Sequence, residues 1–152
     1  MWSSQVPRQL AEIAEKKAHL FHENAALSAS HIDRAEFIRV TCFSEYVADS
    51  FLHNPSLWEE LDTSGLLNQS MEMQDFKEDL TRRLNNTEDI DTLQAQLRFH
   101  RRFHQCRIIW RDVNQLVGLK ETLHDLTCLA DTSIQQCTEW HYRKLTARYG
   151  EP

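Results

Sequence analysis

Arginine and histidine side chains concentrate in one stretch, from Leu97 to Asp112, with the sequence LRFHRRFHQCRIIWRD. Wound as an α-helix of about 3.6 residues per turn, this stretch places no acidic residue three or four positions from any of its arginines. Ion pairs within the helix are therefore excluded, and the arginines need acids of other elements or a phosphate-bearing ligand. We favour structural or interdomain ion pairs over phosphate binding, because charges on a helix usually face solvent or another element. The candidate residues are Arg98, Arg101, Arg102, Arg107, Arg111 and Asp112.

We expect these arginines to divide into two groups. Some should pair with acids on neighbouring helices, for which Glu45, Asp49 and Asp131 are candidates. The others should lie open, where a further domain would dock, because one bundle can hardly supply acids to both sides of the helix. The chain carries a formal net charge of −6, so acids are available for the first group.

His100 and His104 are four residues apart, which is a metal-ligand spacing on a helix. No Asp, Glu or Cys joins them on the same helical face, and a zinc site needs three or four ligands. We therefore predict no metal at this pair and interpret both residues as a polar flank that is either solvated or at an interface. For the same reason, we predict no metal at the pair His19 and His22.

The sequence also lacks the motifs of a self-contained active site. It contains 3 glycines, so no glycine-rich loop can cradle phosphates. Neither a G-x-S-x-G nucleophile motif nor a carboxylate pair placed to hold Mg²⁺ is present. We predict that this chain has no catalytic, cofactor-binding or metal-ligating residue of its own and binds no cofactor.

Long helices should position these residues. With 3 Gly and 3 Pro in 152 residues, the sequence has too few turn residues for a β-rich fold. We predict an all-α fold, a helical bundle that closes with a long antiparallel helical hairpin. Thr87 should cap the first helix of the hairpin and Gly118 should end it. The predicted helices are 7–27, 31–42, 45–53, 55–61, 73–84, 88–117 and 119–148.

Apolar residues at three- and four-residue steps predict the buried face of each helix. One set is Val40, Phe43, Val47 and Phe51, and a second is Leu57, Trp58 and Leu61. A third is Phe76, Leu80 and Leu84. In the hairpin, the predicted stripe of the first helix is Phe99, Phe103, Cys106, Trp110, Val113 and Val117. We expect it to face either the segment from Val40 to Phe51 or the stripe of the second helix, which is Leu123, Leu126, Ala130, Ile134, Cys137, His141 and Leu145.

Composition also limits the binding partners and the cellular compartment that we expect for this protein. The acidic net charge argues against a general nucleic-acid binder. No apolar run is long enough to span a bilayer, and no signal-peptide segment follows Met1. The 4 cysteines have no C-x-x-C spacing and fall mostly on apolar helix faces, so we interpret them as reduced and buried. We expect a cytoplasmic protein that binds neither membrane nor nucleic acid.

Three segments together resemble the N-terminal region of glutamine synthetase adenylyltransferase, the bifunctional adenylyltransferase and adenylyl-removing enzyme family. The first segment is FSEYVADS from Phe43, followed by P-x-L-W-x-x-L from Pro55. The second is the arginine-rich run, similar to the family's L-R-x-x-R-R … R-I-x-W-R-D. The third is LTCLAD from Leu126, similar to L-S-x-L-A-[DE], and the closing Y-G-E-P from Tyr149 resembles Y-G-x-P. Residues 1–30 are outside the resemblance and form, by expectation, a variable N-terminal helix.

In that family, the Y-G-x-P is followed by a nucleotidyltransferase domain with G-M-G-K-L-G-G-x-E-L-N and S-D-x-D motifs. Pro152 precedes any such motif, so residues 31–152 look like the helical region before an absent nucleotidyltransferase domain. The resemblance implies a cytoplasmic enzyme that uses ATP and Mg²⁺ to move AMP onto and off a tyrosine of glutamine synthetase. It implies the rest of the enzyme, glutamine synthetase and the PII regulatory protein as partners. This chain would be a scaffold and would be inactive alone.

Two other functions remain open from the residues themselves. The chain could be a stand-alone helical interaction module that binds an acidic partner through its arginine-rich helix. It could also be an RNA-binding helical module, for which binding should weaken steeply with salt.

Overall fold

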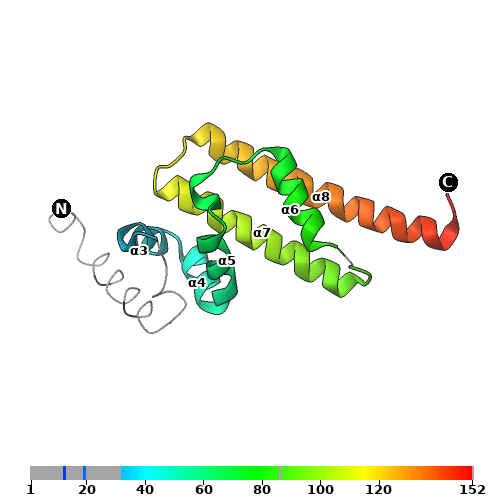
Figure 1. Cartoon of the computed structure of the whole chain (residues 1–152), viewed down its shortest axis with the longest axis horizontal. Helices are drawn as coiled ribbons and strands as arrows, with labels where there is room; N and C mark the ends of the chain where they lie inside the picture. Colours follow the sequence, from blue (N-terminus) through cyan, green and yellow to red (C-terminus); the bar gives the residue numbers. More distant parts are fainter. Residues whose placement is uncertain (1–11, 13–18, 20–31, 86, 152) are drawn as a thin grey trace. The chain divides into compact units, whose positions relative to one another are not determined.

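Helices make up the structure, a computed structural model that describes residues 32–85 and 87–151 together with Glu12 and His19 (Figure 1). It is 82% helical, and the described residues contain no strand, which confirms the all-α prediction. The predicted helix 7–27 lies outside the described residues, apart from Glu12 and His19. The elements are α3 (Arg34–Phe43), α4 (Glu45–His53), α5 (Pro55–Thr63), the 3₁₀ helix η1 (Leu66–Asn68), α6 (Met73–Arg83), α7 (Ile90–Val113) and α8 (Leu119–Tyr149).

The chain divides into two compact units, and α7 contributes to both. The first unit comprises residues 1–69 and 106–118, and the second comprises residues 70–105 and 119–152. Each unit is described by itself below.

Aromatic side chains form the core of the first unit. The Trp58 ring lies at its centre, with ring centroids 4.8 Å from Phe51, 5.0 Å from Phe37 and 5.6 Å from Trp110. All four side chains are buried. Edge and tilted ring contacts of this kind add to the stabilisation from burial itself. The helices α3, α4 and α5 and the end of α7 are therefore held by one cluster.

The sequence locates the helix starts of the first unit only in part. α3 begins at Arg34, after the cap Asp33, and not at residue 31 as predicted. Ser44 ends α3 and begins α4, and its side-chain oxygen accepts a hydrogen bond from the Val47 amide at 3.3 Å. Pro55 is the first residue of α5, as predicted, but the Asn54 side chain does not cap that helix. Its amide instead donates to the Ser50 carbonyl at 3.3 Å. Phe43 is a second departure, because it is 64% exposed and not part of the core.

Three helices meet in the core of the second unit. Leu80 of α6 and Leu84, which directly follows α6, pack with Leu93 of α7 and Trp140 of α8. The Trp140 indole Nε1 donates to the carbonyl of Thr87 at 3.0 Å, so its polar group is satisfied. α7 and α8 run in opposite directions, as the predicted hairpin requires, and α6 packs against α8 (Figure 1).

The ends of α7 differ from the prediction. The Asp89 carboxylate, and not Thr87, caps the helix by accepting from the Thr92 amide at 2.7 Å. α7 ends at Val113, before the predicted stop at Gly118. Gln115 adopts the left-handed conformation with φ 57°, which breaks the helix there.

The buried face of α8 was predicted wrongly. Its buried residues are Asp125, Cys128, Leu129, Thr132, Gln136 and Trp140. The predicted stripe is mostly exposed, with Ile134 at 66% and Leu123 at 54%. On α7, Phe103, Cys106 and Trp110 are buried as predicted. Phe99, Val113 and Val117 are half-buried.

Candidate functional site

The five arginines of α7 differ sharply in exposure. Arg98, Arg101 and Arg102 are exposed, whereas Arg107 and Arg111 are 0% and 4% exposed. Arg98 contacts Gln94 at 3.5 Å within the same helix. The candidate partners Glu45, Asp49 and Asp131 are all exposed, as is Asp112. The two buried arginines belong to the first unit and the three exposed ones to the second.

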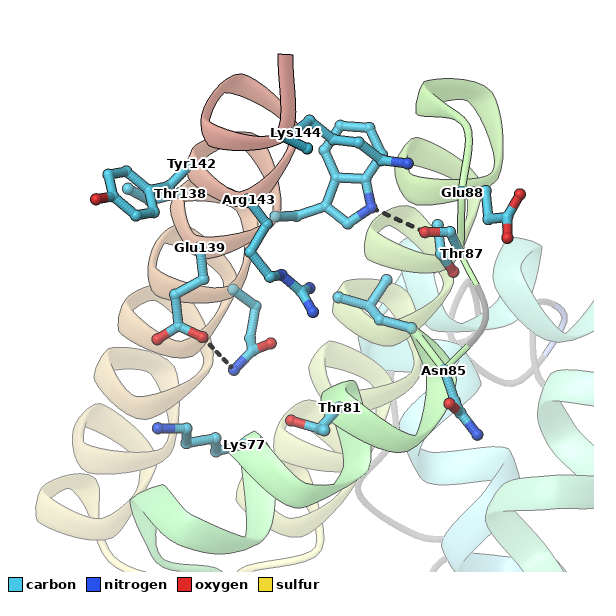
Figure 2. A pocket seen from close by; sticks show the side chains of 14 residues that line it. Lys77, Thr81, Asn85, Thr87, Glu88, Thr138, Glu139, Tyr142, Arg143 and Lys144 are labelled. Atoms are coloured by element: carbon cyan, nitrogen blue, oxygen red, sulfur yellow. Dashed lines mark hydrogen bonds between the residues drawn. The ribbon is translucent and has the colours of Figure 1, made fainter. Parts of the chain in front are cut away.

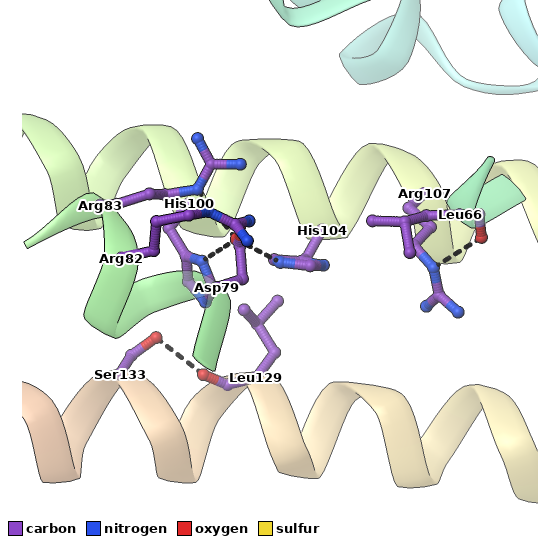
Figure 3. Close-up of polar contacts among 9 residues, drawn as sticks. All are labelled: Leu66, Asp79, Arg82, Arg83, His100, His104, Arg107, Leu129 and Ser133. Atoms are coloured by element: carbon purple, nitrogen blue, oxygen red, sulfur yellow. Dashed lines mark hydrogen bonds and ion pairs between the residues drawn. The ribbon is translucent and has the colours of Figure 1, made fainter. Parts of the chain in front are cut away.

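Arg107 holds the turn that follows α5. Its Nε donates to the carbonyl of Leu66 at 3.0 Å, and a second guanidinium nitrogen donates to the carbonyl of Gln69 (Figure 3). Leu66 is the first residue of η1 and Gln69 directly follows its last, so Arg107 binds both ends of this turn. A guanidinium is suited to this position because it carries several donors in a fixed fork. The sequence showed that no acidic residue of the same helix can pair with Arg107. It could not show that backbone carbonyls accept the hydrogen bonds of Arg107.

A buried carboxylate, Asp79 of α6, is the centre of the second polar cluster. Its Oδ2 lies 2.9 Å from His100 Nδ1 and 3.0 Å from His104 Nε2, and both imidazoles are 0% exposed (Figure 3). Arg83 Nε donates to the same oxygen at 2.8 Å, and Arg82 pairs with Oδ1. We call Asp79, Arg83, His100 and His104 the Asp79 cluster. Of the two interpretations of the histidine flank, the interfacial one therefore agrees with the structure and the solvated one was wrong.

The carboxylate of Asp79 is held in its charged form. Burial by itself raises the pKa of Asp79, but hydrogen bonds from His100, His104 and Arg83 outweigh burial and hold that pKa far below its usual range. The Arg83 guanidinium also stacks over the rings of Phe99 and Phe103, at 4.9 Å and 5.0 Å from their centroids. The cluster thus fixes α6 on the first part of α7.

Asp79 is an acidic residue close to His100 and His104, and it could serve as the third metal ligand that their own helix does not provide. The three possible ligand atoms lie within 4.8 Å of one another. However, Arg82 and Arg83 bind the same carboxylate, and a divalent cation there would stand beside their positive charges. This donor set fits a hydrogen-bonded charge cluster better than a cation site. That no metal binds stays a prediction.

A groove of about 930 Å³ lies beside the core of the second unit (Figure 2). Three cations border it, Lys77, Arg143 and Lys144, together with the acids Glu88 and Glu139. Glu139 accepts a hydrogen bond from Gln136 at 3.5 Å in its wall. Because side chains of both charges border the groove, it favours neither anionic nor cationic ligands.

The described residues thus define an all-α protein in which buried polar groups join helices. No helix among them has both the length and the apolar character needed to cross a membrane. The chain belongs to the glutamate-ammonia ligase adenylyltransferase family, whose sequence profile matches residues 34–152. The resemblance seen in the sequence is confirmed by this match.

Curated relatives include bifunctional glutamine synthetase adenylyltransferase/adenylyl-removing enzymes of several bacteria. The chain is 34% identical to that of Pseudomonas aeruginosa over 137 residues, which are 84% of this chain and 14% of the relative. It is 34% identical to that of Thioalkalivibrio sulfidiphilus over 115 residues, 76% of this chain and 12% of the relative. For the Hahella chejuensis enzyme the identity is 31% over 126 residues, 83% of this chain and 13% of the relative. The chain thus spans a small part of the length of these relatives.

Proposed function

We propose that residues 31–152 act as a helical scaffold within a glutamine synthetase adenylyltransferase/adenylyl-removing enzyme. The observation that carries the proposal is the family match over residues 34–152, at the 30–34% identity of the curated relatives. The enzyme would transfer AMP from ATP to glutamine synthetase with Mg²⁺ and remove it again. Its partners would be the rest of the enzyme, glutamine synthetase and the PII protein, in the cytoplasm.

The polar clusters support a scaffold role, because each joins helices that are distant in the sequence. Asp79 and His104 are 25 residues apart, and Arg107 reaches a carbonyl 41 residues away. Buried charged groups of this kind are costly unless every partner is in place, so they favour one arrangement of the helices. In this proposal the helices hold their attached catalytic domain and do not react themselves.

The proposal assigns the exposed arginines Arg98, Arg101 and Arg102 to contact with the nucleotidyltransferase domain. Among the described residues, Arg101 and Arg102 have no hydrogen-bond or ion-pair partner in the structure. Exposed guanidinium groups are available to carboxylates of another domain, with which they form bidentate pairs.

Activity measurements test the proposal. The whole 152-residue chain should show neither AMP transfer nor AMP removal with glutamine synthetase. A chimera in which this chain replaces the matched region of the Pseudomonas aeruginosa relative should show both activities. Turnover by the purified chain alone would contradict the scaffold role, and so would a folded chimera without either activity.

Charge reversal tests the assignment of the exposed arginines. Arg101→Glu with Arg102→Glu should leave the stability of the isolated chain within about 0.5 kcal/mol, since both side chains are exposed. The same pair should lower the activity of the chimera. If neither property changes, the arginine run is a plain solvated surface.

A second candidate function is a stand-alone interaction module for an acidic partner, and the three exposed arginines favour it. In that case the isolated chain should bind an acidic protein by itself, and binding should weaken as salt rises.

A further inference from the structure

Apolar side chains form a row on the exposed side of α8. The exposed face carries Leu119, Leu123, Leu126, Ala130, Ile134 and Leu145, which we call the α8 stripe. The buried face consists of Asp125, Cys128, Leu129, Thr132, Gln136 and Trp140. A helix with one face packed normally turns polar side chains to solvent. On α8, a row of apolar side chains lies among the exposed polar ones, which indicates that a second surface covers the stripe.

The side chains of the stripe are strongly exposed. Leu119 is 71% exposed, Ile134 is 66% and Leu145 is 57%. Because its members follow one another by three or four residues over most of the stripe, they share one side of the helix. Contiguous exposed apolar surface of this kind marks interaction sites on soluble proteins. The spacing is the one by which an amphipathic helix docks on a partner.

The helix α8 is also much longer than α6, with which it shares the core of the second unit. α8 has 31 residues and α6 has 11. At about 1.5 Å per residue, α8 is roughly 46 Å long and α6 roughly 16 Å. α6 therefore leaves much of α8 without cover, even on its own side.

Charges beside the stripe disfavour a second copy of the chain as its partner. In an antiparallel pair that overlaps the whole stripe, Lys120 of one copy would lie level with Lys144 of the other. The two Asp131 side chains would also come to the same level. Like charges in such register oppose association. A partner that fits would carry acidic side chains toward both ends of its apolar surface.

We propose that the α8 stripe is an interface for the rest of the adenylyltransferase chain, which presents an apolar surface with acids toward both ends. This inference rests on the proposed function. The matched residues are 12–14% of the curated relatives, so most of each relative's chain is available to cover the stripe. Helix α8 thereby has two packed sides, one facing the core that it shares with α6 and α7 and the other facing the rest of the enzyme.

Two adjacent residues provide a matched pair of variants. Ile134 is in the stripe, and Gln135 is exposed on another side of the helix, where it donates to Glu139 at 2.8 Å. Ile134→Lys and Gln135→Lys introduce the same charge one residue apart. In the isolated 152-residue chain, both should unfold at the same urea concentration as the parent, because both sites face solvent.

The experiment compares the isolated chain with the Pseudomonas aeruginosa chimera by hydroxyl-radical footprinting and limited proteolysis. Leu123 and Ile134 should be oxidised more slowly in the chimera than in the isolated chain. Ile134→Lys should speed proteolysis of the chimera about tenfold, which is the effect expected from losing an anchor residue of an interface. It should also restore oxidation of Leu123. Gln135→Lys should do neither.

Each other outcome overturns the inference. Equal oxidation in the chain and the chimera would show that nothing in the enzyme covers the stripe. Dimerisation of the isolated chain that Ile134→Lys abolishes would identify a second copy as the partner. A loss of stability of the isolated chain in Ile134→Lys would show that the chain covers the stripe itself. The proposed function is judged separately, since an inactive chimera with protected Leu123 would refute the function and keep the interface.

Discussion

Replacement of Asp79 by asparagine removes the charge at the centre of the Asp79 cluster while keeping its shape. The carboxylate receives donors from His100, His104 and Arg83, and each of these side chains is nearly or fully buried. The asparagine amide turns two N–H donors toward groups that need an acceptor. The exposed Arg82 adds little, because surface ion pairs contribute about 0–1 kcal/mol.

Removing one partner of a buried charged network costs about 3–5 kcal/mol, and we expect Asp79→Asn to fall in this range. With a urea m-value of about 2 kcal/mol/M, the unfolding midpoint should drop by about 1.5–2.5 M. Circular dichroism and tryptophan fluorescence during urea unfolding at pH 7 measure the change.

Glu78→Gln is the matched control. Glu78 is the neighbouring residue on α6, it is exposed, and it accepts a hydrogen bond from Gln74 at 2.9 Å that glutamine can still accept. Its loss of charge should change the free energy of unfolding by about 0.5 kcal/mol or less. If Asp79→Asn costs no more than Glu78→Gln, the cluster does not hold α6 on α7 and the reasoning is refuted.

The pH dependence of stability follows from the same carboxylate. Folding lowers the pKa of Asp79, so its stabilisation is fully present above the unfolded pKa of about 3.9. That stabilisation is lost as pH falls below this value. As pH falls below this value, the free energy of unfolding should therefore decrease more steeply in the parent than in Asp79→Asn. Equal pH dependence of the two proteins in this range would contradict the assignment.

Three further predictions concern single side chains. Trp110→Ala should lower the free energy of unfolding by about 3–5 kcal/mol, because the indole is 1% exposed, and a loss under 1 kcal/mol in urea unfolding would place it at the surface. Trp140→Phe should cost about 1 kcal/mol through loss of the hydrogen bond to the Thr87 carbonyl, measured in the same way. A disulfide reagent should modify Cys137 before Cys128, because burial raises the pKa of the Cys128 thiol and the thiolate is the reactive form. Faster modification of Cys128 than of Cys137 in single-cysteine variants would refute this prediction.

Local chemistry in the sequence was sufficient to predict much of the fold. The scarcity of Gly and Pro predicted helices, and the predicted helix starts at residues 45 and 55 agree with those of α4 and α5. Apolar periodicity identified the buried set of Leu57, Trp58 and Leu61. These signals work because capping and helical periodicity depend on residues within a few positions of one another.

The candidate site depended on residues that are far apart in the sequence. His100 and His104 appeared solvated because no acid lies near them on their own helix, and Asp79 reaches them from α6. The same limit applies to Arg107, whose acceptors are carbonyls that no side-chain pattern reveals.

For α8, periodicity predicted an apolar stripe, and the tertiary structure decided which face packs. The stripe with Leu123 and Ile134 satisfies the pattern of a buried face, yet α6 packs on the side that carries Leu129 and Trp140. A hydrophobic pattern predicts that a face will be covered, but it contains no information about what covers it. Within the described residues, that choice came from the aromatic and aliphatic core around Trp140, which α6, α7 and α8 build together. The sequence by itself thus determined the helices and their apolar faces, and the tertiary contacts determined which of those faces became core.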